Sequence, residues 1–167
     1  MGENKHIILK KLLNRRRFGG LMSLYDSNYF LIQRLIPDLA DLPEFCVSSV
    51  NKGPDLYLEI VESFKFTTSL RLTYYFKLER GGQIDYIPDP DLALRVYHDA
   101  KVAEVMSCKP QGFMPISKAS IADAKQLSCR WDSNHFLQKW LEYLLDVGHN
   151  FSAENIKQAD RKKFIQN

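Results

Sequence analysis

Apolar and polar side chains alternate from Leu70 to Glu79, and this pattern limits the possible fold more than any other part of the chain. Successive side chains of a β-strand point to opposite faces, so a period of two predicts a strand with one buried face. The apolar positions are Leu70, Leu72, Tyr74, Phe76 and Leu78. A lone strand cannot bury such a face, so the rest of the chain must supply neighbouring strands. Gly81-Gly82 is expected to end this strand.

Four further segments have the composition of strands. Residues 45–50 are a short apolar run that ends at the turn sequence of residues 51–54. Residues 56–61 alternate again, with Leu56, Leu58 and Ile60 on one face. Residues 92–97 and 102–107 complete the set.

The last two segments predict a hairpin with a defined register. If Asp99 and Ala100 are the two turn residues, Arg95 lies opposite Glu104, Leu94 opposite Val105, and Val96 opposite Ala103. Charge then meets opposite charge and apolar meets apolar, which favours this pairing. Asp-Ala suits a tight hairpin turn poorly, and a longer loop would shift the register by one residue.

Three segments have helical periodicity. Residues 5–17 form a basic amphipathic helix that Gly19-Gly20 is expected to end, and a second helix runs from Ser23 or Asp26 to Pro37. A third begins near Asp132 or Ser133 and ends at Gly148. Residues 109–128 are expected to form a long connection with a partial helix, and residues 151–167 a short surface helix or a frayed tail. The predicted fold is α+β, an antiparallel sheet of about five strands flanked by an N-terminal and a C-terminal amphipathic helix.

Charge is distributed unevenly along the chain. The net charge is +3, but the first 17 residues carry +5 and the remainder −2. The basic residues Lys10, Lys11, Arg15, Arg16 and Arg17 could contact nucleic acid or an anionic membrane, or they could be a solvated extension. The expected organisation is an N-terminal extension of residues 1–21, which could be flexible, a single domain of residues 22–150, and a polar tail of residues 151–167.

The cysteines and the apolar runs suggest a location. Cys46, Cys108 and Cys129 are odd in number and have no metal-ligand spacing, so they are interpreted as reduced thiols. No apolar run is long enough to span a membrane or form a signal-peptide core. A cytoplasmic location, no metal site and no cofactor are therefore expected.

No catalytic spacing is present, but one segment is dense in ionisable groups. The predicted hairpin carries Arg95, Tyr97, His98, Asp99 and Glu104. An acid–base site is one interpretation, although adjacent His98 and Asp99 would point to opposite faces unless both lie in the turn. The structural alternative is a hydrogen-bonded His98, a cross-strand Arg95–Glu104 ion pair, and an Asp99 that stabilises the turn.

A second group of candidate residues lies where two strands connect. Glu62, Lys65 and Thr67 occupy this connection, where binding residues are often displayed. Glu62 continues the face of Leu56 and Ile60, so its carboxylate is expected to point toward the interior and pair with Lys65 or His98. The alternative is a solvated hairpin tip.

Several strings together resemble the bacterial YqiB-like family, whose function is unknown. They run from Leu24 to Asn150 and are Leu24-Tyr25 with Asn28, Leu35-Ile36-Pro37, residues 60–67, Leu94 to Ala100, Val102 to Val105, Asn134, Phe136-Leu137, Trp140-Leu141 and Gly148. The resemblance implies a small cytoplasmic bacterial protein and brings no activity or catalytic residue. Because similar proteins begin near Met22, that residue is an alternative start. N-terminal sequencing that finds residues 1–21 would contradict it.

Three functions follow from these observations. The first is a non-enzymatic regulatory or interaction module that binds a protein or a small ligand. The second is an enzyme with an acid–base site around residues 97–104, and the third is polyanion binding by the N-terminal residues. Convergence of Glu62, Lys65, His98 and Glu104 on one pocket would favour the enzyme, whereas dispersal would favour the module.

Overall fold

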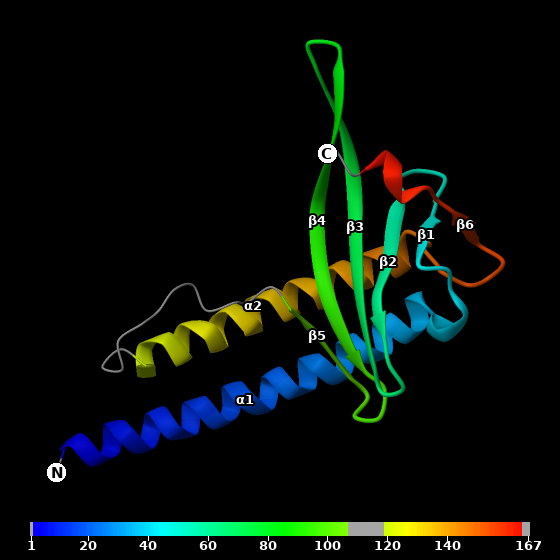
Figure 1. The fold of residues 1–167 in the computed structure, drawn as a ribbon. Coiled ribbons are helices and arrows are strands. Elements are labelled where there is room, and N and C mark those ends of the chain that lie inside the picture. The colour runs from blue at the N-terminus through cyan, green and yellow to red at the C-terminus, as the bar shows by residue number, and fades with distance from the viewer. Residues whose placement is uncertain (1, 107–118, 165–167) are drawn as a thin grey trace.

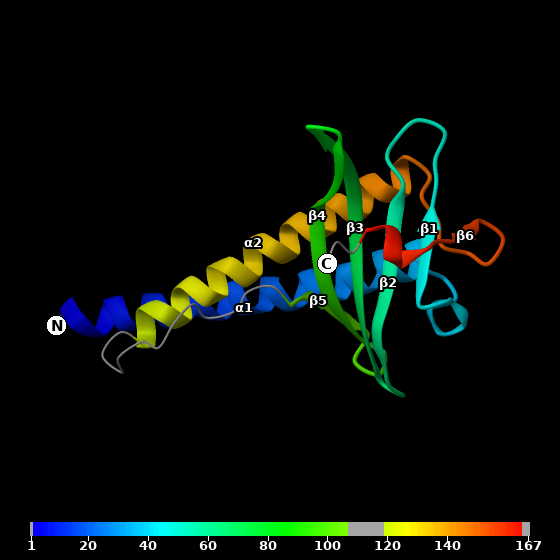
Figure 2. The same cartoon turned by 45° about the horizontal axis from the view of Figure 1, so that its top comes forward.

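Two long helices cover one face of an antiparallel sheet (Figures 1 and 2). The computed structural model describes residues 2–106 and 119–164, and side chains for residues 19–106 and 126–164. The six described strands have the order β5-β4-β3-β2-β1-β6. The elements are α1 Gly2–Leu35, η1 Leu39–Asp41, β1 Phe45–Ser48, β2 Leu56–Ser63, β3 Thr67–Arg80, β4 Gln83–Tyr97, β5 Val102–Val105, α2 Ala119–Asp146, β6 Ile156–Gln158 and η3 Arg161–Lys163. This architecture confirms the predicted α+β fold.

The core lies between the sheet and the two helices. Leu72 and Leu94 of the sheet, Ile32 and Leu35 of α1, and Leu141 of α2 are among its fully buried members. The helices run side by side in the same direction, and both project beyond the sheet at the end nearer the N-terminus (Figure 1). Within the described part of the chain, no helix is long and apolar enough to span a membrane.

α1 is one continuous helix, so the predicted end at Gly19-Gly20 is wrong. Glycine weakens a helix by about 1 kcal/mol but does not terminate it when packing favours continuation. Here Gly20 lies against α2: a Cβ atom at this position would come within 2.9 Å of the Trp131 ring. Leu21, one residue later, is buried. The helix ends at Leu35, as Pro37 predicted.

β3 and β4 form a hairpin longer than the rest of the sheet. Gly81 and Gly82 connect them with φ angles of +56° and +84°, as a tight hairpin turn requires. β4 begins at Gln83, so the predicted start at residue 92 is wrong. Two prolines, Pro88 and Pro90, made a strand here unexpected, because proline cannot donate a backbone hydrogen bond to a neighbouring strand. However, β5 pairs only with residues 94–97 of β4, so no described strand pairs with the outer edge of β4 at these prolines.

The register of the β4–β5 hairpin is confirmed. Arg95 lies opposite Glu104, Leu94 opposite Val105, and Val96 opposite Ala103. The connection is longer than two residues, because Tyr97 pairs with Val102 and four residues lie between them. The register is the predicted one because the loop contains one more residue on each side of Asp99-Ala100, namely His98 and Lys101.

The C-terminal segment joins the sheet through β6, a strand that the prediction of a short surface helix or a frayed tail did not include; its one helical turn is η3. β6 pairs with β1 and adds the sixth strand, and Phe151 is fully buried. Arg161 forms an ion pair with Glu59 at 2.6 Å, and the Phe164 ring stacks on Tyr75 with 4.3 Å between centroids. These contacts hold the segment on the open face of the sheet. The exact bounds of extension, domain and tail stay predictions.

α2 begins at Ala119, so the predicted start near residue 132 is wrong, while its end before Gly148 is confirmed. The apolar periodicity before residue 129 is weak, so the sequence did not predict the first turns of α2. Of the cysteines, Cys46 is a free, buried thiol as predicted, whereas Cys129 is disulfide-bonded, contrary to prediction. Cys108 lies outside the described residues. The cytoplasmic location therefore stays a prediction.

Candidate interaction surface

The two groups of candidate residues meet at one end of the sheet. Thr67 pairs with Tyr97, and the backbone N–H of His98 donates to the carbonyl of Phe66 at 2.9 Å. The β2–β3 and β4–β5 connections are therefore neighbours, next to α1 at the bottom of Figure 1. We call residues 61–67 and 97–101 the loop end.

Glu62 is exposed, so the prediction that its carboxylate points toward the interior is wrong. A β-bulge shifts the register between Ile60 and Glu62. A bulge inserts an extra residue into one strand, and from there the simple alternation of faces no longer holds. The alternation of side chains along one strand therefore could not predict the position of this bulge or the direction of Glu62.

His98 lies at the edge of the core. Its Nε2 lies 2.8 Å from Oγ1 of the buried Thr68. Asp99 is exposed in the turn, and the Lys65 ammonium lies 4.9 Å from the centroid of the Phe66 ring. These three groups therefore have different surroundings, in agreement with the structural interpretation of His98.

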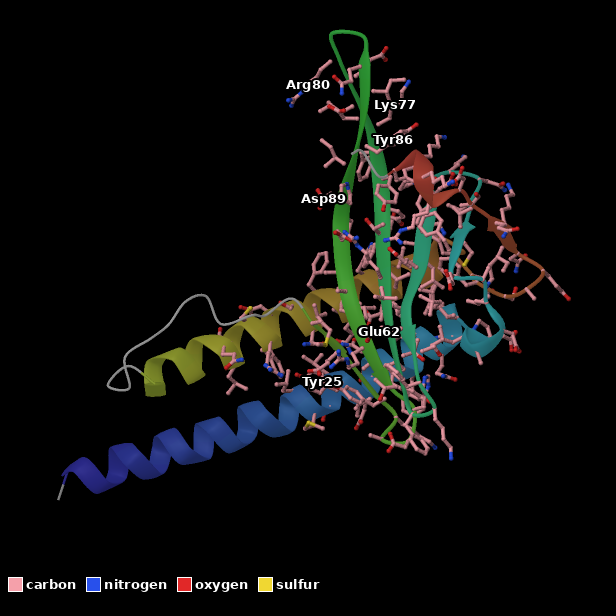
Figure 3. All side chains as sticks on the ribbon, in the orientation of Figure 1. Tyr25, Glu62, Lys77, Arg80, Tyr86 and Asp89 are labelled. Carbon is pink, nitrogen blue, oxygen red and sulfur yellow. The ribbon has the colours of Figure 1, made fainter. Side chains whose placement is uncertain are left out.

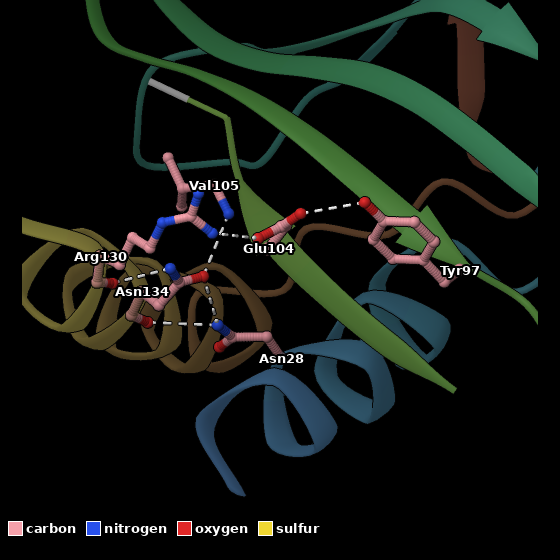
Figure 4. A network of polar contacts seen from close by, with 6 residues as sticks. All are labelled: Asn28, Tyr97, Glu104, Val105, Arg130 and Asn134. Carbon is pink, nitrogen blue, oxygen red and sulfur yellow. Dashed lines mark hydrogen bonds and ion pairs between the residues drawn. The ribbon is translucent and has the colours of Figure 1, made fainter. Parts of the chain in front are cut away.

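Glu104 is largely buried, but its partners differ from the predicted one. Tyr97 Oη donates to Oε1 at 3.0 Å, and Arg130 of α2 donates to Oε2 at 3.4 Å (Figure 4). Arg95, although directly opposite in register, lies with its Nε 3.5 Å from Ser69 Oγ. Burial and the hydrogen bond to Glu104 both raise the pKa of Tyr97. This arrangement keeps the phenol protonated and suits a hydrogen-bond donor rather than a base.

Sequence reasoning did not assign a role to two buried asparagines beside this cluster. Asn134 Oδ1 accepts a hydrogen bond from the backbone N–H of Val105 at 3.0 Å, and its Nδ2 donates to the Arg130 carbonyl at 2.7 Å (Figure 4). Asn28 Nδ2 donates to the Asn134 carbonyl at 3.2 Å. The signal was available, because both residues interrupt the apolar stripe of their helix.

Tyr25 of α1, which is labelled in Figure 3, interacts electrostatically with Arg130 and Glu104 of the same cluster. Burial raises its pKa, and the nearby Arg130 guanidinium opposes this effect. Tyr25 Oη and Asn28 Oδ1 have no hydrogen-bond partner among the described residues. The cluster joins α1, α2 and β5 through polar contacts, and Arg130 is its partly exposed member.

The exposed apolar residues of the loop end are its most unusual feature. The side chains of Val61, Phe64 and Phe66 are 57%, 66% and 53% exposed. Val61 also lines a cavity of about 230 Å³, together with Leu39, Leu42 and Ile60. Glu44 and Glu62 lie at the same cavity (Glu62 is labelled in Figure 3). Apolar clusters exposed in this way commonly mark interaction sites.

The described side chains do not include the predicted polyanion contacts. Lys10, Lys11, Arg15, Arg16 and Arg17 lie on α1, in the part whose side chains fall outside the described residues. Among the residues that are described, no group of three His, Cys, Asp or Glu side chains could hold a metal ion.

A family comparison agrees with the resemblance seen in the sequence. The model of DUF1249, described as a protein of unknown function, matches residues 31–150. The chain therefore belongs to the DUF1249 family. It is 32% identical to the uncharacterized protein YqiB of Escherichia coli K12 over 134 residues, which cover 78% of this chain and 90% of the relative. The YqiB proteins of strains O6:H1 and O157:H7 match equally well, and no solved structure matches.

Proposed function

We propose that this protein is an interaction module that binds another protein through the loop end. The observation that carries the proposal is the group of three large apolar side chains, each more than half exposed, of which Val61 lines a cavity with both apolar and acidic residues. Exposed aromatic and aliphatic residues next to a small cavity are the usual anchors of a protein interface.

The charges around the cavity indicate the chemistry of the partner. Glu44 and Glu62 place two carboxylates beside the apolar floor formed with Leu42 and Ile60. A segment that presents an apolar side chain next to a lysine or arginine would fill the cavity and neutralise this rim. The proposed partner is therefore a protein segment of apolar and basic character.

The dispersal of the ionisable candidates supports a module rather than an enzyme. Glu62 lies at the cavity, Lys65 over the Phe66 ring, His98 against Thr68, and Glu104 between Tyr97 and Arg130. An acid–base mechanism needs its groups within hydrogen-bond reach of one reacting atom. Polyanion binding by the N-terminal residues stays a prediction, and it requires an affinity that falls steeply with salt.

Peptide selection tests the proposal. A display library of random peptides of about ten residues is selected on the folded protein, and the selected peptides are compared on Phe64→Ser and Phe66→Ser. We expect enriched peptides to combine an apolar residue with lysine or arginine and to bind both variants more weakly. Ile84→Ser is the matched control, because Ile84 is also exposed but lies next to the Gly81-Gly82 turn of the β3–β4 hairpin. Selection of the same peptides on both variants would reject the loop end as the site.

A further inference from the structure

The far part of the β3–β4 hairpin is a two-stranded arm that rises beyond the other strands. Lys77, Arg80 and Tyr86 lie along it (Figure 3). A two-stranded ribbon is only marginally stable in water, because it has no layer against which to bury side chains. This arm nevertheless carries large apolar residues. Phe76 and Ile87 lie directly opposite each other, so they share one face, and both are close to half exposed.

That face continues onto α2 through a series of ring contacts. Phe76 packs edge-on against Tyr74, and Tyr74 edge-on against Trp140, with 6.3 and 5.7 Å between centroids. Trp140 stacks on Phe136 with 6.4 Å between centroids. Phe136 is 48% exposed, and Tyr143, which lies three residues after Trp140 on the same helix, is 50% exposed. We call this set the aromatic strip; it consists of Phe76, Ile87, Tyr74, Trp140, Phe136 and Tyr143.

The same face of the arm contains a carboxylate that needs a hydrogen-bond donor. Asp85 lies opposite Leu78, so it shares the face of Phe76 and Ile87. Its Oδ1 is buried and has no partner among the described residues. Between Phe136 and Tyr143, α2 carries the exposed Lys139, whose ammonium contacts Glu142 at 2.8 Å on one side. The Asp85 oxygen thus has no donor among the described residues, and α2 displays a cation within the same strip.

The edge of the arm is unsuitable for adding another strand. Pro88 and Pro90 have no N–H group to donate, and Asp89 adds a negative charge between them. Whatever covers the arm must therefore pack on its face and not extend its sheet.

From these observations we infer that the aromatic strip is the interface of a symmetric dimer of this chain, in which the arm of one protomer packs against α2 of the other. A two-fold axis makes each contact twice, so the apolar face of each arm meets the exposed aromatics of the other helix. The same rotation brings Asp85 of each protomer toward Lys139 of the other. The strip lies on elements other than the loop end, so this inference does not depend on the proposed function.

Sedimentation equilibrium of the full chain tests the dimer. At about 100 μM, where an interface with a Kd of about 1 μM is largely occupied, we expect twice the mass of one 19.4 kDa chain. Phe136→Asp and Phe76→Asp should each restore the mass of a single chain, whereas Ile84→Asp should remain dimeric because Ile84 lies on the other face of the arm. Circular dichroism confirms that each variant is folded. A wild-type monomer at this concentration, or a dimer that persists in both folded strip variants, would overturn the inference.

Charge reversal tests the contact between protomers. We expect Lys139→Glu alone to raise the dimer Kd about tenfold, and the additional Asp85→Lys substitution in the same chain to restore it. Identical dimer Kd values for the single and double reversals would contradict the pairing of Asp85 with Lys139.

Because Phe136 is exposed, Phe136→Ser provides a milder variant for sedimentation equilibrium if Phe136→Asp fails to fold.

Discussion

The backbone N–H of Val105 donates to the side-chain oxygen of Asn134 at 3.0 Å, and this contact joins the edge strand β5 to helix α2. Asn134 in turn accepts, through its carbonyl, a hydrogen bond from Asn28 of α1. Through its side chain and its backbone carbonyl, one buried residue thus connects both helices to the edge of the sheet that carries Glu104.

Replacement of Asn134 by alanine is expected to lower the free energy of unfolding by about 1–3 kcal/mol, because the Val105 N–H loses its acceptor in a buried position. Urea denaturation measures this change. Asn51→Ala is the matched control, since Asn51 is exposed in a turn and its replacement should change stability by less than about 0.5 kcal/mol. Equal effects of the two substitutions would contradict the role of Asn134.

The two adjacent glycines of α1 should respond differently to alanine. At Gly19 a Cβ atom would meet nothing within 4 Å, so Gly19→Ala should stabilise the protein by up to about 1 kcal/mol through helix propensity. At Gly20 the same atom would press against the Trp131 ring, so Gly20→Ala should be less stable than Gly19→Ala. Thermal unfolding of both variants checks this order. Two variants of equal stability would argue against close packing of α1 on α2 at this point.

His149 predicts a pH dependence of stability. Burial lowers its pKa, against the weaker opposing effects of Ser48 and Asp55, so the folded protein holds a neutral imidazole where the unfolded chain binds a proton. The free energy of unfolding should therefore fall as the pH drops below about 6.5, the pKa of an unperturbed histidine, toward the lower pKa of the folded state. At higher pH, His149 is neutral in both states and no longer lowers the free energy of unfolding.

Urea midpoints at about pH 7.5 and about pH 5.5 measure this dependence. His149→Gln should reduce the difference between the two midpoints, while His135→Gln should leave it unchanged, because His135 is exposed on α2. A difference that is the same in wild type and His149→Gln would assign the pH dependence to other groups.

The Cys46 thiol should resist alkylation in the native protein. The residue is fully buried, and burial raises the pKa of its thiol to about 11, so almost no thiolate is present at neutral pH. Iodoacetamide treatment followed by peptide mass spectrometry should find Cys46 unmodified in the native state and modified in urea. Rapid alkylation of Cys46 in the native protein would mean that β1 separates readily from its neighbouring strands.

The parts of the fold that sequence predicted best are those where two independent signals agreed. The β4–β5 register followed from an opposite-charge pair and two apolar pairs at once, and it held although the loop was longer than expected. The failures share a cause, because they depend on neighbours distant in sequence. The continuity of α1 depends on how Gly20 packs against Trp131, and the strand around Pro88 depends on the short length of β5.

For the candidate residues too, contacts with residues distant in sequence could not be predicted. Sequence left open whether the two connections meet, and in the structure Phe66 and His98 are bonded neighbours. It could not place Glu62, because a bulge inverts the alternation there, nor could it find the Arg130–Glu104 contact, which spans 26 positions. Asn28 and Asn134 could have been found, since a polar residue in an apolar stripe must be satisfied by a buried partner.

Isothermal titration calorimetry with one selected peptide tests the central claim most directly. The peptide is titrated into wild type, Phe66→Ser, Glu62→Lys and the control Ile84→Ser. Binding at the loop end predicts that Phe66→Ser and Glu62→Lys each raise the Kd about tenfold or more, through loss of an anchor and reversal of a rim charge, with Ile84→Ser unchanged. One Kd shared by all four proteins would contradict the assignment of the loop end as the binding surface.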